Sequence, residues 1–391
     1  MQHSLMDHVG LSWPFIVLVA WFVGEVGFQI TRIPRISFYI LCGFLFFNNK
    51  FGISANLSTF HVNFLINIAI GLILFEFGHR INLNWLKNNP KIILTGLLES
   101  LATFVVIFVV SKLFSLSTMA SLEFATLSIA TSPIIVMYIV NQNQSSGQVT
   151  ERILHLSAIN SFIAIFLFKL VFGLVVFQKS GNILQATWTS ILMVMFSVIL
   201  GILFAVILSF IMAKINIIAY DRTVAFAIFV ISLVVVAVAC NLSPFIAVLI
   251  FSIFLRHKRV AIGKTQRNFG ALGELLTVIL FIFIPSVLHF GDYTLTLWVS
   301  VTLILARILT KVIVVGFCSY FDGLSWSKSF LVGFALTPIS VFSILILEPS
   351  KYAGVSIFTQ LSSLAVVFLL LEIISPIITQ YALGRAKENL T

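Results

Sequence analysis

Charged residues are scarce in this chain. They make up 9% of its 391 residues, whereas hydrophobic residues make up 60%. A soluble domain carries roughly 25% charged residues, so this chain lacks the polar surface that a soluble fold needs. Cysteines are also few: Cys42, Cys240 and Cys318 all lie in or beside apolar runs. This placement indicates small buried side chains rather than a disulfide framework or a metal site.

Motifs for nucleotides and for catalysis are missing as well. Gly384 stands alone, and no GxGxxG or Walker pattern occurs, so the sequence predicts no bound cofactor and no ATP-driven transport by this chain. The histidines form no ligand-spaced group and no Ser-His-acid set, which argues against an enzyme. The chain ends soon after its last apolar run, so we expect no soluble regulatory domain.

Long apolar runs fill almost the whole sequence. A membrane-spanning helix needs about 20 apolar residues, and the pattern predicts about thirteen such helices. The predicted spans are 12–31, 35–48, 62–80, 91–112, 119–141, 152–177, 186–213, 221–239, 244–256, 272–290, 294–319, 327–348 and 354–382. We therefore expect an all-α integral membrane protein that forms one transmembrane domain over residues 1–391.

The basic residues between the spans predict an orientation. With the N-terminus outside, only Lys50, Lys112, Lys179 and Lys351 fall on the outer side, and the other loop cations face inward. Cytoplasmic loops carry the excess of Lys and Arg, so the C-terminus is expected in the cytoplasm. Residues 1–10 contain no Lys or Arg and do not resemble a signal peptide. A plasma membrane, of the bacterial inner-membrane type, is the expected location.

The net charge of +10 is concentrated in such loops, above all in residues 256–267. We interpret that cluster as a topology anchor, with anionic lipid as the alternative ligand, and we expect no nucleic-acid partner.

Three pairs of unusual residues recur at nearly one spacing. Pro34 and Pro244, Pro133 and Pro338, and Glu99 and Arg307 are separated by 210, 205 and 208 residues. The offset corresponds to seven predicted spans, an odd number. This spacing predicts two repeats of inverted topology, at about 12–177 and 221–382, linked by a helix at about 186–213.

Proline inside a spanning helix predicts a broken helix. It removes an N–H donor and frees a carbonyl, which must be satisfied within the membrane. Broken helices offer hydroxyls, carbonyls and helix ends, which suit a small cation. The candidate ion-binding groups are therefore Thr131, Ser132 and Pro133 in one span and Thr337 and Pro338 in another.

Charged residues inside predicted spans are costly and are usually functional. Arg307 and Lys311 lie four residues apart, on one face of a predicted helix. Two buried cations need nearby acids or carbonyls, and Glu99 and Glu372 are the expected partners.

Five stretches resemble the monovalent cation:proton antiporter superfamily, of the sodium/proton exchanger type. In chain order they are RIPRISFYILCGFLF, GLILFEFGHRINLNWLKNNP, ATSPIIVMYI, ARILTK and LEIISPIITQYAL. The resemblance covers about residues 12–385. It implies two crossed broken helices in a core domain, a scaffold domain that often forms a dimer interface, and alternating access. It also implies exchange of sodium or potassium for protons, with Lys311 at the position of the basic residue.

The sequence departs from the family pattern at one decisive position. The family carries an aspartate after a polar residue, whereas this chain has Asn160 and Ser161. A serine hydroxyl can coordinate a cation but does not exchange a proton near neutral pH. Three possibilities stay open: a proton carried by Glu99 or, second, by Glu372; titration of Lys311 itself; or a channel-like or degenerate protein that does not perform antiport.

Overall fold

The computed structural model describes residues 12–47, 59–180, 183–214, 222–258, 275–285, 293–340 and 365–388. Within these ranges the regular elements are helices, which confirms the all-α prediction. Six of the described helices are long and apolar enough to cross a membrane. The total of thirteen spans stays a prediction.

The helices follow the apolar runs closely. Their bounds are α1 Ser12–Thr31, α2 Arg35–Phe47, α3 Thr59–Arg80, α4 Leu83–Asn88, α5 Lys91–Leu113, α6 Thr118–Ile129, α7 Pro133–Gln142, α8 Gln148–Ser180, α9 Ile183–Lys214, α10 Arg222–Ala239, α11 Pro244–His257, α13 Tyr293–Phe321, α14 Trp326–Ala335 and α17 Ala365–Arg385. A further short apolar helix covers Leu275–Pro285. The short helix α4 was not predicted, because its six residues contain too little apolar sequence to resemble a span.

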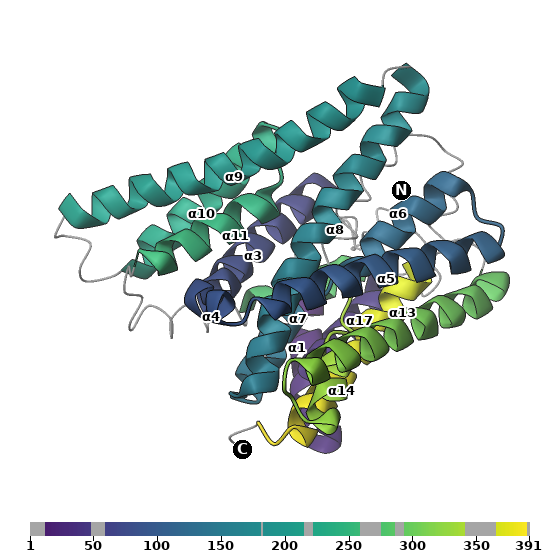
Figure 1. The fold of residues 1–391 in the computed structure, drawn as a ribbon. Coiled ribbons are helices and arrows are strands. Elements are labelled where there is room, and N and C mark those ends of the chain that lie inside the picture. The colour runs from purple at the N-terminus through teal and green to yellow at the C-terminus, as the bar shows by residue number, and fades with distance from the viewer. Residues whose placement is uncertain are drawn as a thin grey trace, which may run out of the picture.

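Two groups of helices divide the molecule. In Figure 1, α9 runs along one side with α10, α11 and α3 beneath it, while α5, α13 and α14 lie on the other side. Helices α5, α6, α8, α13, α14 and α17 pack against one another through successive pairs. These helices correspond to the six that the family resemblance implies for the core domain. The inverted repeats themselves remain a prediction.

The predicted break at Pro133 is present. Helix α6 ends at Ile129, and α7 begins at Pro133 after an extended segment, Ala130–Ser132. The Ser132 hydroxyl caps α7 by accepting a hydrogen bond from the Ile135 N–H at 3.3 Å. Proline suits the first helical position because its missing N–H would have no partner there. The Ser-Pro sequence therefore restarts the helix immediately after the extended segment.

A second extended segment crosses the first. Helix α14 ends at Ala335, and residues 336–340 leave the helical path. The Ser132 N–H donates to the Pro338 carbonyl at 3.0 Å, and Thr131 forms an antiparallel bridge with Ile339. The two proline-containing segments are therefore hydrogen-bonded to each other, although they lie about 200 positions apart in the sequence. Residues 341–364 of the predicted spans lie outside the described residues.

Candidate functional site

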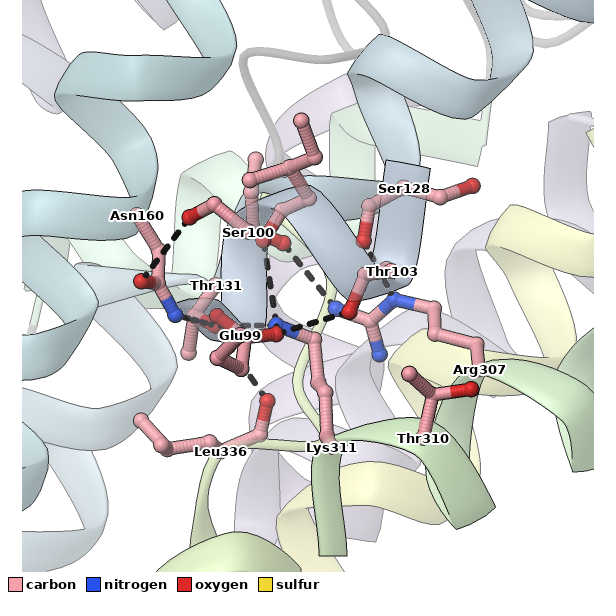
Figure 2. Close-up of polar contacts among 12 residues, drawn as sticks. Glu99, Ser100, Thr103, Ser128, Thr131, Asn160, Arg307, Thr310, Lys311 and Leu336 are labelled. Carbon is pink, nitrogen blue, oxygen red and sulfur yellow. Dashed lines mark hydrogen bonds and ion pairs between the residues drawn. The ribbon is translucent and has the colours of Figure 1, made fainter. Parts of the chain in front are cut away.

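Side chains from three helices converge on the first extended segment. Figure 2 shows Glu99 of α5, Asn160 of α8 and Lys311 of α13 around Thr131. All four side chains are fully buried. The candidate site is thus a polar cluster enclosed by otherwise apolar helices.

Glu99 and Lys311 form the charged centre of this cluster. The Lys311 ammonium lies 2.5 Å from Glu99 Oε1, and neither side chain is exposed. Thr103, one turn further along α5, donates to the same carboxylate oxygen at 2.9 Å. Glu99 Oε2 is buried and has no hydrogen-bond partner within the described ranges. One carboxylate oxygen is therefore engaged, and the other is available to a ligand.

Lys311 also binds the end of α6. Its ammonium donates to the Ile129 carbonyl at 3.1 Å and to the Thr131 hydroxyl at 3.2 Å. A lysine ammonium has three N–H donors, so Glu99, Ile129 and Thr131 use them all. Lys311 thereby connects the carboxylate of α5 to the negative end of a half-helix.

The Thr131 hydroxyl links the two extended segments. It donates to the Leu336 carbonyl at 3.3 Å and accepts from Asn160 Nδ2 at 3.3 Å. The Asn160 carbonyl oxygen accepts in turn from the Ser100 hydroxyl of α5 at 3.4 Å. These long, polar contacts are weaker than the bonds around Lys311, so a ligand could replace them at low cost.

Ser161 does not replace the missing aspartate. Its hydroxyl donates to the Thr131 carbonyl at 2.7 Å and is completely buried. This contact holds α8 against the extended segment. Ser161 therefore has a structural bond that an acceptor-only aspartate could not make to a carbonyl.

Gly96 allows the carboxylate of α5 to reach this site. A Cβ atom at residue 96 would lie 2.7 Å from Ile159 Cγ2, too close for an ordinary contact. With glycine at this position, α5 and α8 approach closely enough for Ser100 to bond Asn160. Glu99 consequently lies beside the helix on which the family aspartate is expected.

Arg307 has a different environment from Lys311. Its guanidinium donates to the carbonyls of Ser128 at 2.8 Å and Ala130 at 3.0 Å. It also donates to the Pro338 carbonyl at 3.4 Å and, by a short bond, to the Thr337 carbonyl. Arg307 thus fastens the ends of α6 and α14 together. The expected acidic partner is absent from its described bonds, and backbone carbonyls take its place.

Three predicted residues have positions that differ from those of ion ligands. Thr337 turns its hydroxyl back to the Phe334 carbonyl at 2.9 Å, and only its own carbonyl meets Arg307. Ser132 and Pro133 form the start of α7. Their described roles are to shape the backbone.

Glu372 does not pair with Arg307 or Lys311 within the described residues. It lies on α17, is 1% exposed, and neither carboxylate oxygen has a hydrogen-bond partner. The prediction of a direct ion pair was wrong, because Glu99 and the backbone carbonyls already satisfy both cations.

Glu123 was missed by the sequence reasoning. This acid on α6 is completely buried. Its position inside the predicted span 119–141 was a signal of the kind that identified Glu99. Polar residues next to it in the sequence make this span look less apolar than the other spans, so a charged residue is less conspicuous there.

A cavity of about 700 Å³ lies along α7. One face of this helix lines it, with Ile134, Met137, Tyr138 and Asn141 at helical spacing. Glu25 and Glu76 line the same cavity, and Glu25 pairs with Arg35 at 2.7 Å. Ile134, in the first turn of α7, is the lining residue of this helix nearest in sequence to the extended segment, and the site residues Glu99, Thr131, Asn160 and Lys311 are not among those that line the cavity.

Crossed extended segments inside a helical membrane fold, with a buried ion pair at their crossing, define the class of ion-translocating secondary transporters with discontinuous helices. A family model for the transmembrane domain of sodium/hydrogen exchangers matches residues 15–383. The chain belongs to this sodium/hydrogen exchanger family.

Solved structures show the same fold. The sodium proton antiporter MjNhaP1 from Methanocaldococcus jannaschii at pH 8 aligns with a TM-score of 0.71 and 16% identity, over 95% of this chain and 96% of that one. A structure of the same antiporter from electron microscopy aligns with a TM-score of 0.71 and 18% identity, over 99% and 100% of the two chains. A search of curated protein sequences finds no match.

Proposed function

We propose that this protein is a monovalent cation:proton antiporter in which Glu99 carries the exchangeable charge. The observation that carries this proposal is the buried Glu99–Lys311 pair beside Asn160 and Thr131. Membership of the sodium/hydrogen exchanger family and the similarity in fold to a sodium proton antiporter support it. The cargo is sodium or potassium, exchanged against protons by alternating access.

The proposed mechanism is competition at one carboxylate. A dehydrated alkali ion prefers oxygen ligands, and Glu99 Oε2, the Asn160 side-chain oxygen and the Thr131 hydroxyl supply them. Binding of the cation displaces the Lys311 ammonium from Glu99, and a proton on Glu99 excludes the cation. Because the cation and the proton each neutralise the Glu99 carboxylate in place of the Lys311 ammonium, the two occupy the site alternately rather than together.

Ser161 favours the alternative of a channel-like or degenerate protein, since it removes the family aspartate. The position of Glu99 argues against that alternative. Its carboxylate lies on α5, next to α8, and is linked to Asn160 through the Lys311 ammonium and the Thr131 hydroxyl. In this proposal the carboxylate has moved from one helix of the site to its neighbour.

Solid-supported-membrane electrophysiology and pH-sensitive dyes in proteoliposomes test the proposal. We expect sodium or potassium jumps to drive proton movement in the wild type at transporter rates, and Glu99→Gln to abolish it. Glu25→Gln is the matched control, because Glu25 is an acid that lies in the cavity rather than at the pair. Exchange that continues at the wild-type rate in Glu99→Gln would falsify the assignment.

A relocation variant sharpens this test. Glu99→Gln combined with Ser161→Asp moves the carboxylate to the family position and should recover part of the exchange. Currents far above transporter turnover in the wild type would instead support a channel. The absence of any flux under all sodium, potassium and lithium gradients would support the degenerate subunit.

The proposal includes a location. The protein lies in a plasma membrane with its N-terminus outside and its C-terminus in the cytoplasm, as the distribution of basic residues predicts. The scaffold helices form the interface of a homodimer, as the family resemblance implies. Labelling of single cysteines from either side of the membrane tests the orientation, and cross-linking in native membranes tests the homodimer.

A further inference from the structure

Glu372 is a buried acid that the proposed mechanism does not use. Its side chain is 1% exposed, and both carboxylate oxygens are buried without a hydrogen-bond partner among the described residues. An ionised carboxylate in such a place would lack any compensation for the loss of water. An ionised Glu372 would therefore need a positively charged ligand at this position.

Other oxygen atoms gather at the same level of α17. Ser375 lies one turn further on the same face, and its hydroxyl is buried and unpaired. Pro376, inside the helix, has no N–H to donate to the carbonyl four residues earlier, which is that of Glu372. Carboxylate, hydroxyl and freed carbonyl thus occupy one stretch of helix.

This stretch of α17 is connected to the second extended segment. Thr379, on the same face as Glu372 and Ser375, donates to the Ala335 carbonyl at 3.2 Å, where α14 ends. Ser340, at the far end of the described part of that segment, also has a buried hydroxyl without a partner in the part of the chain that the structure describes. Glu372 is therefore on the helix that contacts the end of α14 beside the second extended segment, away from Glu99 on α5.

No cation is available to pair with Glu372 on the described parts of the helices that pack against α17. These helices are α2, α7, α13 and α14, and each of their cations already has a partner. The cations and their partners are Arg35 with Glu25, Lys311 with Glu99, Lys328 with Glu388, and Arg307 with four backbone carbonyls.

Two other charged groups lie near this part of the fold. Helix α6 adds a second acid, Glu123, next to Phe124, whose ring packs on the Phe368 ring of α17 with 6.3 Å between the ring centroids. Arg385 on α17 itself lies more than three turns away and bonds Tyr381.

We propose that Glu372 is a second proton-binding group, which takes up a proton on one side of the membrane and releases it on the other in the same cycle as Glu99. The inference rests on the proposed function, and it adds a second proton to the exchange. The proton forms an O–H bond on the carboxylate and leaves to water when the site faces the opposite side. Glu372 does not line the cavity along α7, and a proton is the cation that fits such an enclosed position.

The first test measures the ratio of protons to cations from the reversal potential in proteoliposomes. Glu372→Gln keeps the shape of the protonated acid but cannot release a proton. We expect this variant to continue exchange with fewer protons per cation than the wild type. Glu123→Gln is the matched control and should keep the wild-type ratio. An unchanged ratio in Glu372→Gln would overturn the proposal, whereas lost exchange in Glu99→Gln reports separately on the proposed function.

The second test observes the proton directly and does not need Glu372→Gln to fold. Infrared spectra of the protein with isotope-labelled glutamate should show the carbonyl band of a protonated acid, with an intensity that titrates with pH. The band should persist in the Glu99→Gln, Glu123→Gln double variant, and Ser375→Ala should shift its frequency. A double variant without a titrating band would overturn the proposal, even if the wild type exchanges cations.

Discussion

Arg307 and Lys311 lie on one face of α13, yet they bind different kinds of partner. Arg307 donates to four backbone carbonyls at the ends of α6 and α14, whereas Lys311 pairs with the Glu99 carboxylate. A guanidinium offers a rigid fork with five donors, which suits several carbonyls at once. An ammonium is a compact charge that a competing cation can replace. Arg307 therefore holds the crossing together, whereas Lys311 is the cation that takes part in the exchange proposed above.

Replacement of Arg307 should have the largest effect on the fold. Arg307→Gln leaves the ends of two half-helices without their donors, and loss of one buried charged partner typically costs about 3–5 kcal/mol. We expect poor accumulation of the protein and a strongly lowered unfolding temperature by fluorescence-detected size exclusion. Arg307→Lys should rescue only part of this loss, because one ammonium cannot reach all four carbonyls. If Arg307→Gln had the stability of the wild type, Arg307 would not hold the crossing together, and its proposed difference in role from Lys311 would be wrong.

Replacement of Lys311 should instead damage exchange and reveal coupling to Glu99. Each of Glu99→Gln and Lys311→Gln leaves an uncompensated buried charge, whereas the double variant leaves none. We expect both single variants to unfold at lower temperature and the double variant to regain most of the loss, without regaining exchange. A thermal double-mutant cycle measures this coupling. Additive losses would show that the two residues do not act as a pair.

The sequence predicted the elements that depend on local physics. Apolar runs of membrane length gave α1, α5, α8 and α9 to within a few residues at most ends, and Ser132-Pro133 gave the break between α6 and α7. It also identified Glu99 and Lys311 as partners, because buried charges need compensation. The second break is described only on the side of α14.

The sequence did not predict how Arg307 is satisfied, nor that Glu372 lies apart from both cations. Backbone carbonyls at helix ends leave no trace in a sequence, so an acid was assigned to Arg307 where four carbonyls serve. The position of Glu99 next to α8 depends on the close approach at Gly96, which is a property of packing between helices. Such contacts are set by the three-dimensional fold and not by spacing along one helix.

Glu388 offers a further comparison among the buried charged groups, because its carboxylate binds backbone N–H groups. It accepts from the N–H groups of Val149 at 3.0 Å and Thr150 at 2.8 Å, at the start of α8. Glu388→Gln keeps the shape but loses the charge at the helix N-terminus, so we expect a loss of about 1 kcal/mol in stability. Exchange at saturating cation should stay near the wild-type rate. Thermal unfolding and transport assays on the same preparation separate the two effects.

Gly147 offers a matched variant for the same contact. Its φ of +156° and the nearby Glu388 side chain leave no room for a Cβ atom. Gly147→Ala should therefore destabilise the protein at least as much as Glu388→Gln. A larger effect on transport than on stability in either variant would show that the contact belongs to the exchange machinery.

The Glu25–Arg35 pair should give the smallest effect, because it is the exposed counterpart of Glu99–Lys311. Its side chains are 28% and 27% exposed and 2.7 Å apart. Water and salt screen such a pair, which contributes less than about 1 kcal/mol. We expect Glu25→Gln to leave the unfolding temperature nearly unchanged, and any difference from the wild type to disappear at high salt. If Glu25→Gln lowered the unfolding temperature as much as Glu99→Gln does, independently of salt, the cavity would have to close around the Glu25–Arg35 pair during transport. Burial in this one conformation would then not distinguish exchange residues from peripheral ones.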